Sequence, residues 1–295
     1  MKIIEPKVQI LLQSSGLEGV YKQIEICGRT CYKSEDKITD TSAKPFVERM
    51  IKSLHYAMLE HGTIYLKANC PEGFIGQTEM VERYKANPYS VVKHCGGTYL
   101  ITTNYRVIVE NGWFDDLEYM CEPTPCHEMR ISVKFRTQIA VTREMNRHRV
   151  NSIAESSTRY CNYTKDKFGG EISIIRPEWQ YGIDYTISHD DDFLHSLASN
   201  LCNYKSWSPV VKWWFANAIA EKMYLSMIEE DELKPQDART ILPLDTSTEI
   251  VHTAFLKDWR HFFDLRSKGT TGKPHPDILW VARELENMFE TLGLV

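Results

Sequence analysis

The chain has 295 residues, of which 42% are hydrophobic and 25% are charged, and its net charge is −5. These values exclude a globally disordered chain, and they allow one large α+β domain or two closely packed halves. The acidic charge argues against general attraction to nucleic acid, although it leaves room for a local basic pocket that binds a phosphorylated ligand.

No apolar run approaches the ~18–20 residues that a membrane span requires, and the start MKIIEPKVQI lacks the apolar core of a secretory signal. The sequence therefore predicts a cytoplasmic protein without a membrane partner. Eight cysteines occur without a CxxC pair, which favours reduced, structural thiols. Cys121, Cys126 and His127 lack a second matching pair of ligands, so we predict no metal site.

The first half of the chain contains one strong amphipathic pattern. Apolar residues recur at helical spacing from 43 to 58, behind potential capping side chains, and predict a helix that ends near residue 60. Gly62 can close that helix in the left-handed conformation, and 63–66 has the composition of a strand. His61 is therefore expected at a helix-to-strand junction, where side chains often enter sites.

Breaks in the pattern divide the middle of the chain. Residues 70–97 carry several prolines and glycines and are interpreted as an irregular loop, an insertion or a lid. After a second break at 122–127, the alternation at 131–135 predicts a half-buried strand, and 137–149 is predicted to be helical. The arginines near 147 therefore begin at the end of a helix.

The rest of the chain is predicted to be mostly helical. Strand-like stretches lie at 160–165 and 171–175, and a helical region covers roughly 190–230. The elements expected after it are a helical turn at 235–239, a strand at 248–253, a helix at 256–265 and a final helix with Ile278, Ala282, Leu285 and Phe289 on one face. We expect one domain over 1–295, an α+β fold with a mixed or antiparallel sheet flanked by helices, and no GxGxxG dinucleotide fold.

The densest group of chemically active side chains is the string REMNRHRVNSIAESSTRY at 143–160. On a helix, Arg143 and Arg147 share one face, with Glu144 and His148 on the neighbouring face. One interpretation is a solvated surface of ion pairs that each contribute little. The other is a set of guanidinium groups that converge on phosphate or pyrophosphate, because guanidinium offers a planar fork of donors and stays charged. Spacing alone leaves both open.

RHR followed by seven residues and a serine resembles the signature of the flavin-dependent thymidylate synthases. The segments GRTCYKS at 28–34, LEHGTIYL at 59–66, ARTILP at 238–243 and DWRHFFDLR at 258–266 resemble that family in the same order, so nearly the whole chain outside 70–97 is covered. The resemblance implies the thymidylate synthase-complementing protein fold and methylation of dUMP to dTMP. It also implies FAD, NADPH and methylenetetrahydrofolate as cofactors or co-substrates, and a homotetramer with sites shared between subunits.

The resemblance assigns roles residue by residue. Contacts to dUMP are implied for Glu144, Arg147, Glu155, Ser157, Arg159, Arg239 and Arg266, and contacts to FAD for His61, Arg147, His148, Arg149, Glu155, Lys257 and His275. Arg266 is also the expected catalytic residue, because an always-charged guanidinium stabilises negative charge on the pyrimidine carbonyl without a proton transfer. For His61 and His275, an ordinary surface or loop histidine is the alternative.

Four positions depart from the family pattern. Ala154 stands where Asn or Gln is common, Glu144 where Gln is frequent, and Phe255 and Lys257 where some members carry Asn and Arg that hold FAD. Lysine supplies charge but no guanidinium fork, so these positions bear on details of flavin and uracil contact. A flavoprotein of another reaction, or an inactive relative, is one alternative.

Two further features have competing interpretations. The arginines with Tyr160 and Tyr163 could bind a single-stranded nucleic acid, but the acidic charge makes that partner a weaker hypothesis. Pro125-Cys126-His127 matches the PCH of the unrelated classical thymidylate synthases, whose cysteine attacks C6 of dUMP. Its flanks do not resemble that family, so Cys126 is interpreted as structural and Ser157 as a binding residue.

Overall fold

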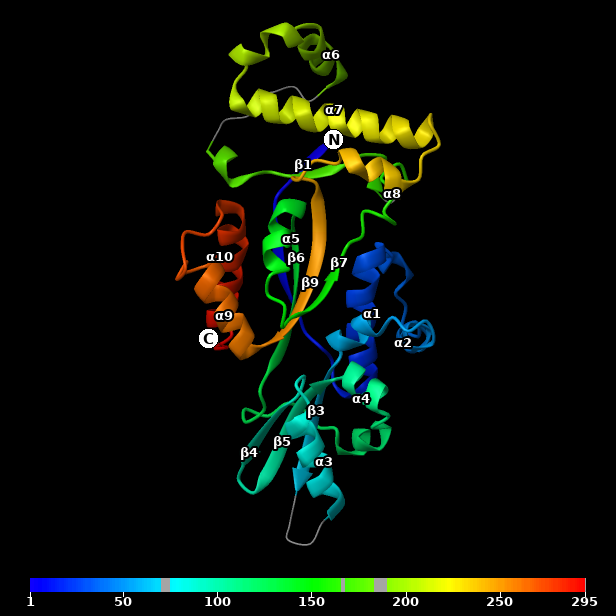
Figure 1. The fold of residues 1–295 in the computed structure, drawn as a ribbon, viewed down its shortest axis with the longest axis vertical. Helices are drawn as coiled ribbons and strands as arrows, with labels where there is room; N and C mark the ends of the chain where they lie inside the picture. Colours follow the sequence, from blue (N-terminus) through cyan, green and yellow to red (C-terminus); the bar gives the residue numbers. More distant parts are fainter. Residues whose placement is uncertain (70–74, 166–167, 183–189, 295) are drawn as a thin grey trace.

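A four-stranded antiparallel sheet lies at the centre of the protein (Figure 1), in the order β2 (Lys7–Leu11), β6 (Arg130–Gln138), β9 (Ser247–Phe255) and β7 (Ser152–Glu155). The structure is a computed structural model that describes residues 1–69, 75–165, 168–182 and 190–294. Strands β6 and β9 pair along their whole length. Both predicted strands are confirmed, and β6 is longer and more buried than expected.

Two helices cover one face of this sheet, namely α9 (Leu256–Arg266) and α10 (Pro276–Thr291). Their apolar residues form the main core with those of β6 and β9, and the four residues predicted to share one face of the last helix are all fully buried. Helix α1 (Gly16–Tyr32) covers the other side, where Cys27 packs against Ala154 and Val251. The prediction of an α+β fold with a sheet flanked by helices is confirmed.

A second antiparallel sheet forms one end of the molecule, in the order β3 (Thr63–Asn69), β5 (Thr98–Asn104) and β4 (Val91–Cys95). It is accompanied by α3 (Ile75–Ala86) and α4 (Tyr105–Asn111) (Figure 1). The irregular interpretation of 70–97 is therefore wrong from residue 75 onward, and 70–74 lie outside the described residues. Gly96 and Gly97, with φ of 58° and 80°, form the tight turn between β4 and β5 rather than a loop.

The opposite end contains a short parallel pair of β1 (Lys2–Ile4) and β8 (Ser173–Ile175), together with α6 (Asp191–Ser199), α7 (Pro209–Glu229) and α8 (Pro235–Ala238) (Figure 1). The helical region expected at 190–230 is interrupted between α6 and α7. The strand expected at 160–165 is wrong, because Asn162 accepts hydrogen bonds from Thr164 and holds a turn there. Strand β8 confirms part of the stretch at 171–175.

The helix expected from 43 to 60 is shorter than its pattern. Helix α2 (Ala43–Lys52) ends before Leu54, which adopts a φ of 58°, and a 3₁₀ helix then runs from Tyr56 to His61. Gly62 has a φ of −81°, so the left-handed prediction is wrong. Glycine is needed there for space, because a Cβ would lie 2.7 Å from side-chain carbons of Ile24 and Val20. His61 does lie at the predicted helix-to-strand junction.

The cysteines are not all reduced, which corrects the sequence prediction. Cys95 at the end of β4 and Cys126 in the loop before β6 form a disulfide, with their Cα atoms 6.5 Å apart. A Lys93–Glu128 ion pair at 2.6 Å joins the same two segments.

Among the described residues, no helix is long and apolar enough to span a membrane.

Candidate active site

The arginine motif lies in a series of turns between α5 (Ile139–Met145) and β7, at one end of the central sheet. Because α5 ends at Met145, Arg143 and Arg147 do not share a helix face, which corrects that prediction. The backbone N–H of His148 donates to Met145 and that of Asn151 donates to His148. These turns bury the His148 side chain and leave those of Arg147 and Arg149 exposed.

Arg266, at the C-terminal end of α9, reaches this motif and is held by it. Its Nη1 donates to Glu144 Oε2 at 2.9 Å, its Nη2 to the Glu144 carbonyl at 3.0 Å, and its Nε to His148 Nε2 at 3.2 Å. Burial, Arg266 and His261 lower the pKa of His148 to about 4, so its imidazole is neutral and can accept this bond. Two segments more than a hundred residues apart therefore hold one guanidinium in a fixed orientation.

Glu155 closes the same region from the end of β7. Its Oε1 accepts from Thr142 Oγ1 at 2.7 Å and its Oε2 from Asn146 Nδ2 at 3.4 Å. Glu155 thus contacts α5 and the turn after it. Ala154 is buried against α1 and presents no polar group at its departure position.

A separate group of predicted ligands lies between the end of the motif and α8. Arg159 Nε donates to Gln236 Oε1 at 3.4 Å, and Arg239 Nη1 donates to Thr158 Oγ1 at 3.3 Å. The Ser157 hydroxyl accepts from the Arg159 backbone N–H. Both guanidinium groups are exposed, and neither has an ion-pair partner within the described ranges. This phosphate cluster, Ser157, Arg159 and Arg239, can bind an anion.

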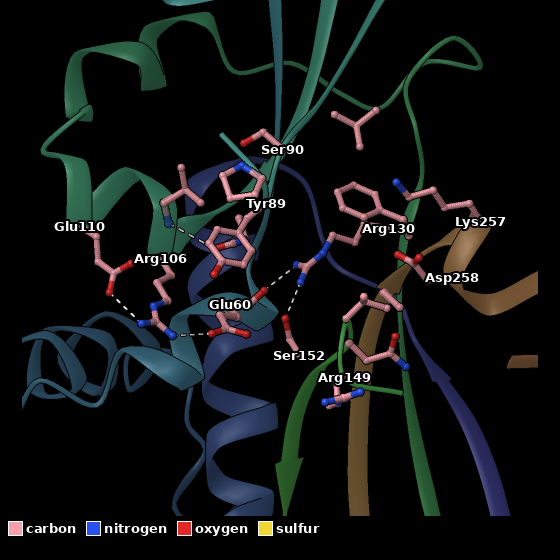
Figure 2. A pocket seen from close by; sticks show the side chains of 18 residues that line it. Glu60, Tyr89, Ser90, Arg106, Glu110, Arg130, Arg149, Ser152, Lys257 and Asp258 are labelled. Atoms are coloured by element: carbon pink, nitrogen blue, oxygen red, sulfur yellow. Dashed lines mark hydrogen bonds and ion pairs between the residues drawn. The ribbon is translucent and has the colours of Figure 1, made fainter. Parts of the chain in front are cut away.

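A cavity of about 450 Å³ lies between the central sheet and the second sheet (Figure 2). Arg149 and Lys257 line it, so the structure brings together two of the residues assigned to FAD. The opposite wall comes from β5, α4 and the turn before β4. It includes Tyr89 and Arg106, whose guanidinium is held by Glu60 at 2.6 Å and Glu110 at 2.9 Å.

Phe255, which stands where some family members carry Asn, lies in the wall of this cavity. Its ring lines the cavity, with the Lys257 ammonium 5.6 Å and the Arg130 guanidinium 5.8 Å from its centroid. The ring therefore contacts both cations through its face, where an asparagine would offer hydrogen bonds.

The structure does not bring His61 and His275 to this cavity. His61 is fully buried and bonds through Nδ1 to Thr253 Oγ1 at 2.7 Å, so the surface-histidine alternative does not apply to it. His275 caps α10 by accepting from the Asp277 backbone N–H, and it has no contact with another predicted site residue in the described part of the chain. Of the residues assigned to FAD by resemblance, Arg149 and Lys257 are the two that line this cavity.

Cys126 has no free thiol for a nucleophilic role, because it is bonded to Cys95. His127 is buried and bonds to Thr124 and to the Leu66 carbonyl, which fixes the loop against β3. The structural interpretation of the PCH string is confirmed.

The family follows from a comparison with known sequences. The profile of the family described as "Thymidylate synthase complementing protein" matches residues 110–292. The chain belongs to this family. The matched range contains the arginine motif, the phosphate cluster and Arg266, whereas Glu60, His61 and the Tyr89–Arg106 wall of the cavity precede it.

Individual relatives are similar over shorter or more distant matches. The probable flavin-dependent thymidylate synthase of Paramecium bursaria Chlorella virus 1 is 32% identical over 79 residues, which are 25% of this chain and 36% of that relative. The match thus spans about a third of the relative's length. Two crystal structures of the UMP/dUMP methylase PolB from Streptomyces cacaoi, bound with 5-Br dUMP or 5-Br UMP, are 14% identical. They cover 99% of this chain and 93% or 92% of PolB, with TM-scores of 0.42.

Sequence reasoning missed Arg130 and the acidic clamp of Arg106. Both arginines line the cavity, and Arg130 is buried at the start of β6. An arginine that opens a strand resembles a surface residue in sequence, and nothing in its neighbours marks it. The clamp joins Glu60 to residues of α4, which no local pattern connects.

We expect this family member to lose stability as the pH falls from about 6.5 to about 4. Burial lowers the pKa of His148 to about 4 and those of His61 and His252 to about 3. The unfolded chain therefore binds more protons in this range, and each histidine contributes a slope of about 1.4 kcal/mol per pH unit. Urea unfolding at several pH values measures that slope, and His252→Gln is expected to reduce it by one histidine's share. An unchanged slope in the variant contradicts this account.

Proposed function

We propose that this family member methylates dUMP to dTMP, with methylenetetrahydrofolate as the carbon donor, FAD as the hydride carrier and NADPH as the reductant. The observation that supports this most directly is the contact between Arg266 and the arginine motif. Glu144 and His148 hold the guanidinium that the family resemblance assigns to the pyrimidine. A solvated surface of independent ion pairs does not explain a guanidinium bound to both groups at once.

Arg266 is suited to polarise a pyrimidine carbonyl. Its three bonds to the protein use three of its five N–H donors, which leaves two for a ligand oxygen. Because Glu144 and His148 fix its orientation before the ligand arrives, little reorganisation is needed when negative charge develops. Cys126 is blocked and the Ser157 hydroxyl contacts no base in the described residues, so the proposal uses no enzyme nucleophile.

The phosphate of dUMP is proposed to bind at the phosphate cluster. Two arginines and a serine hydroxyl offer charged and neutral donors without a competing carboxylate contact in the described chain. The cluster and Arg266 lie on different segments, and family resemblance implies that one site combines residues of several subunits. We therefore propose that a partner's cluster and this chain's Arg266 act on one nucleotide.

Arg149 and Lys257 are proposed to hold phosphate groups of FAD. The two side chains line one cavity, and neither makes an ion pair within the described ranges, so both are suited to an anionic dinucleotide. When bound, the flavin supplies the hydride that completes the methyl group. His148 is proposed to act through Arg266, since its Nε2 is already bonded to that side chain.

We expect the purified protein to have a native mass about four times 34.3 kDa. Helix α7 is apolar around most of its circumference, and its residue Met223 is 50% exposed. These features are expected of a helix that packs against another subunit. Light scattering after size-exclusion chromatography measures the mass, and Met223→Asp is expected to shift it downward. A monomer that still makes dTMP would contradict the shared-site proposal.

The proposed function is tested by titrating the apo protein with FAD and then with dUMP while the flavin absorption is recorded. A saturable flavin complex whose spectrum changes on addition of dUMP supports the proposal. A protein that binds neither ligand contradicts it.

A further inference from the structure

Arg130, the first residue of β6, carries a buried guanidinium without an ion pair. Its side chain is 9% exposed, and its Nη1 and Nη2 donate to the Glu60 carbonyl at 2.5 Å and to Ser152 Oγ at 2.6 Å (Figure 2). Both acceptors are neutral, and no carboxylate lies within ion-pair distance among the described residues. By contrast, the equally buried Arg29 is paired with Glu25 at 2.7 Å.

A buried charge without a counter-ion is costly, and proteins retain such groups mainly at functional sites. Burial lowers the pKa of Arg130 only to about 10, so the side chain is a cation at neutral pH. The carboxylates of Glu60 and Asp258 stabilise this charge only at longer range, because neither lies within ion-pair distance of Arg130 and that of Glu60 is bound by Arg106 at 2.6 Å. A missing negative charge at this position is therefore the feature to be explained.

The surroundings of Arg130 have an excess of unpaired positive charge. Arg130, Arg149 and Lys257 line the cavity of about 450 Å³ without ion pairs in the described part of the chain, and Asp258 is the one lining carboxylate that is not engaged by Arg106. Arg130 also lines a second cavity of about 310 Å³. The guanidinium thus lies where a ligand in the larger cavity can reach it.

We propose that Arg130 binds an oxyanion of the ligand that enters this cavity. Two of its five N–H donors are used by Glu60 and Ser152, and the remaining donors can form a charge-assisted pair with a phosphate or carboxylate. This inference rests on the proposed function for its two sources, which are the pyrophosphate of FAD and the glutamate carboxylates of the folate. Arg130 lies outside the family motif at 143–160.

The test compares Arg130→Met with Arg106→Met by isothermal titration calorimetry. Arg106 is the matched control, because it lines the same cavity but is already neutralised by Glu60 and Glu110. The probes are inorganic pyrophosphate, FAD against riboflavin, and pteroylglutamate against pteroate. Arg130→Met is expected to weaken binding of pyrophosphate and FAD, or of pteroylglutamate, about 10- to 100-fold. Riboflavin, which lacks the pyrophosphate, and pteroate, which lacks the glutamate carboxylates, are expected to change less than about threefold.

Loss confined to pyrophosphate and FAD identifies the dinucleotide as the source, and loss confined to pteroylglutamate identifies the folate. Unchanged binding of every charged probe, or an equal loss in Arg106→Met, overturns the inference. If Arg130→Met does not fold, Arg130→Lys keeps the charge without the fork and is expected to lose about 3- to 10-fold, whereas unchanged affinity overturns the inference. If the protein makes no dTMP but its pyrophosphate binding still depends on Arg130, the proposed function fails and this inference stands.

Discussion

Replacing Arg266 by alanine is expected to lower the rate of dTMP formation by about 10²- to 10³-fold, the usual effect of removing a preorganised donor to developing negative charge. Glu144 and His148 hold the Arg266 guanidinium in a fixed orientation, so the alanine variant loses a donor that is oriented before the substrate binds. Single-turnover formation of dTMP measures the effect. FAD affinity is expected to stay within about threefold, because Arg266 does not line the cavity with Arg149 and Lys257.

Arg260→Ala is the matched control for this prediction. Arg260 lies on the same helix α9 and is exposed, without an ion pair in the described structure. Its removal is expected to leave the rate within about twofold, since it contacts neither the motif nor the cavity. Equal losses in the two variants, or an unaffected Arg266→Ala, would show that Arg266 has no special role.

Trp259→Ala is expected to lower the free energy of unfolding by about 3–5 kcal/mol, the range for removal of a large buried aromatic side chain. Trp259 is fully buried, packs against Phe135, Phe262 and Phe289, and donates from Nε1 to the Ile131 carbonyl at 3.1 Å. The truncation leaves a cavity and removes the hydrogen bond to Ile131. Because Trp259 anchors the helix that carries Arg266, activity is expected to fall as well.

Trp280→Ala provides the comparison for the stability measurement. Trp280 belongs to the adjacent helix α10 but is 37% exposed, so its removal is expected to cost less than about 1.5 kcal/mol. Urea denaturation followed by circular dichroism measures both variants. A Trp259→Ala protein as stable as Trp280→Ala would contradict the assignment of Trp259 to the main core.

The elements predicted best are those in which the spacing of apolar residues along the sequence coincides with the face that is buried. Strand β9 and helices α9 and α10 pack one face against the main core, so the spacing of apolar residues locates them. Helix α3 was missed although Met80, Val81 and Tyr84 are buried, because glycines and prolines at its borders dominate the local composition. Of these residues, Gly76 lies in the first turn of α3, whereas Pro88, Gly96 and Gly97 follow the helix in the chain.

The site was predictable only where one contiguous string carries it. The motif at 143–160 is such a string and contains the candidates His148 and Arg149, and a second string at 258–266 contains the candidate Arg266. Arg130 could not be found in this way, because its role depends on three-dimensional contacts with Glu60 and Ser152. The disulfide of Cys95 and Cys126 was not predicted for the same reason, because the fold brings the end of β4 next to the loop before β6.

The most direct test of the account is an anaerobic reaction of the purified protein, loaded with FAD and reduced by NADPH, with dUMP and methylenetetrahydrofolate. The account predicts that dTMP forms as the flavin absorption returns, and that omission of either substrate abolishes the product. Reduced flavin that stays reduced, with no dTMP formed in the complete mixture, would contradict it.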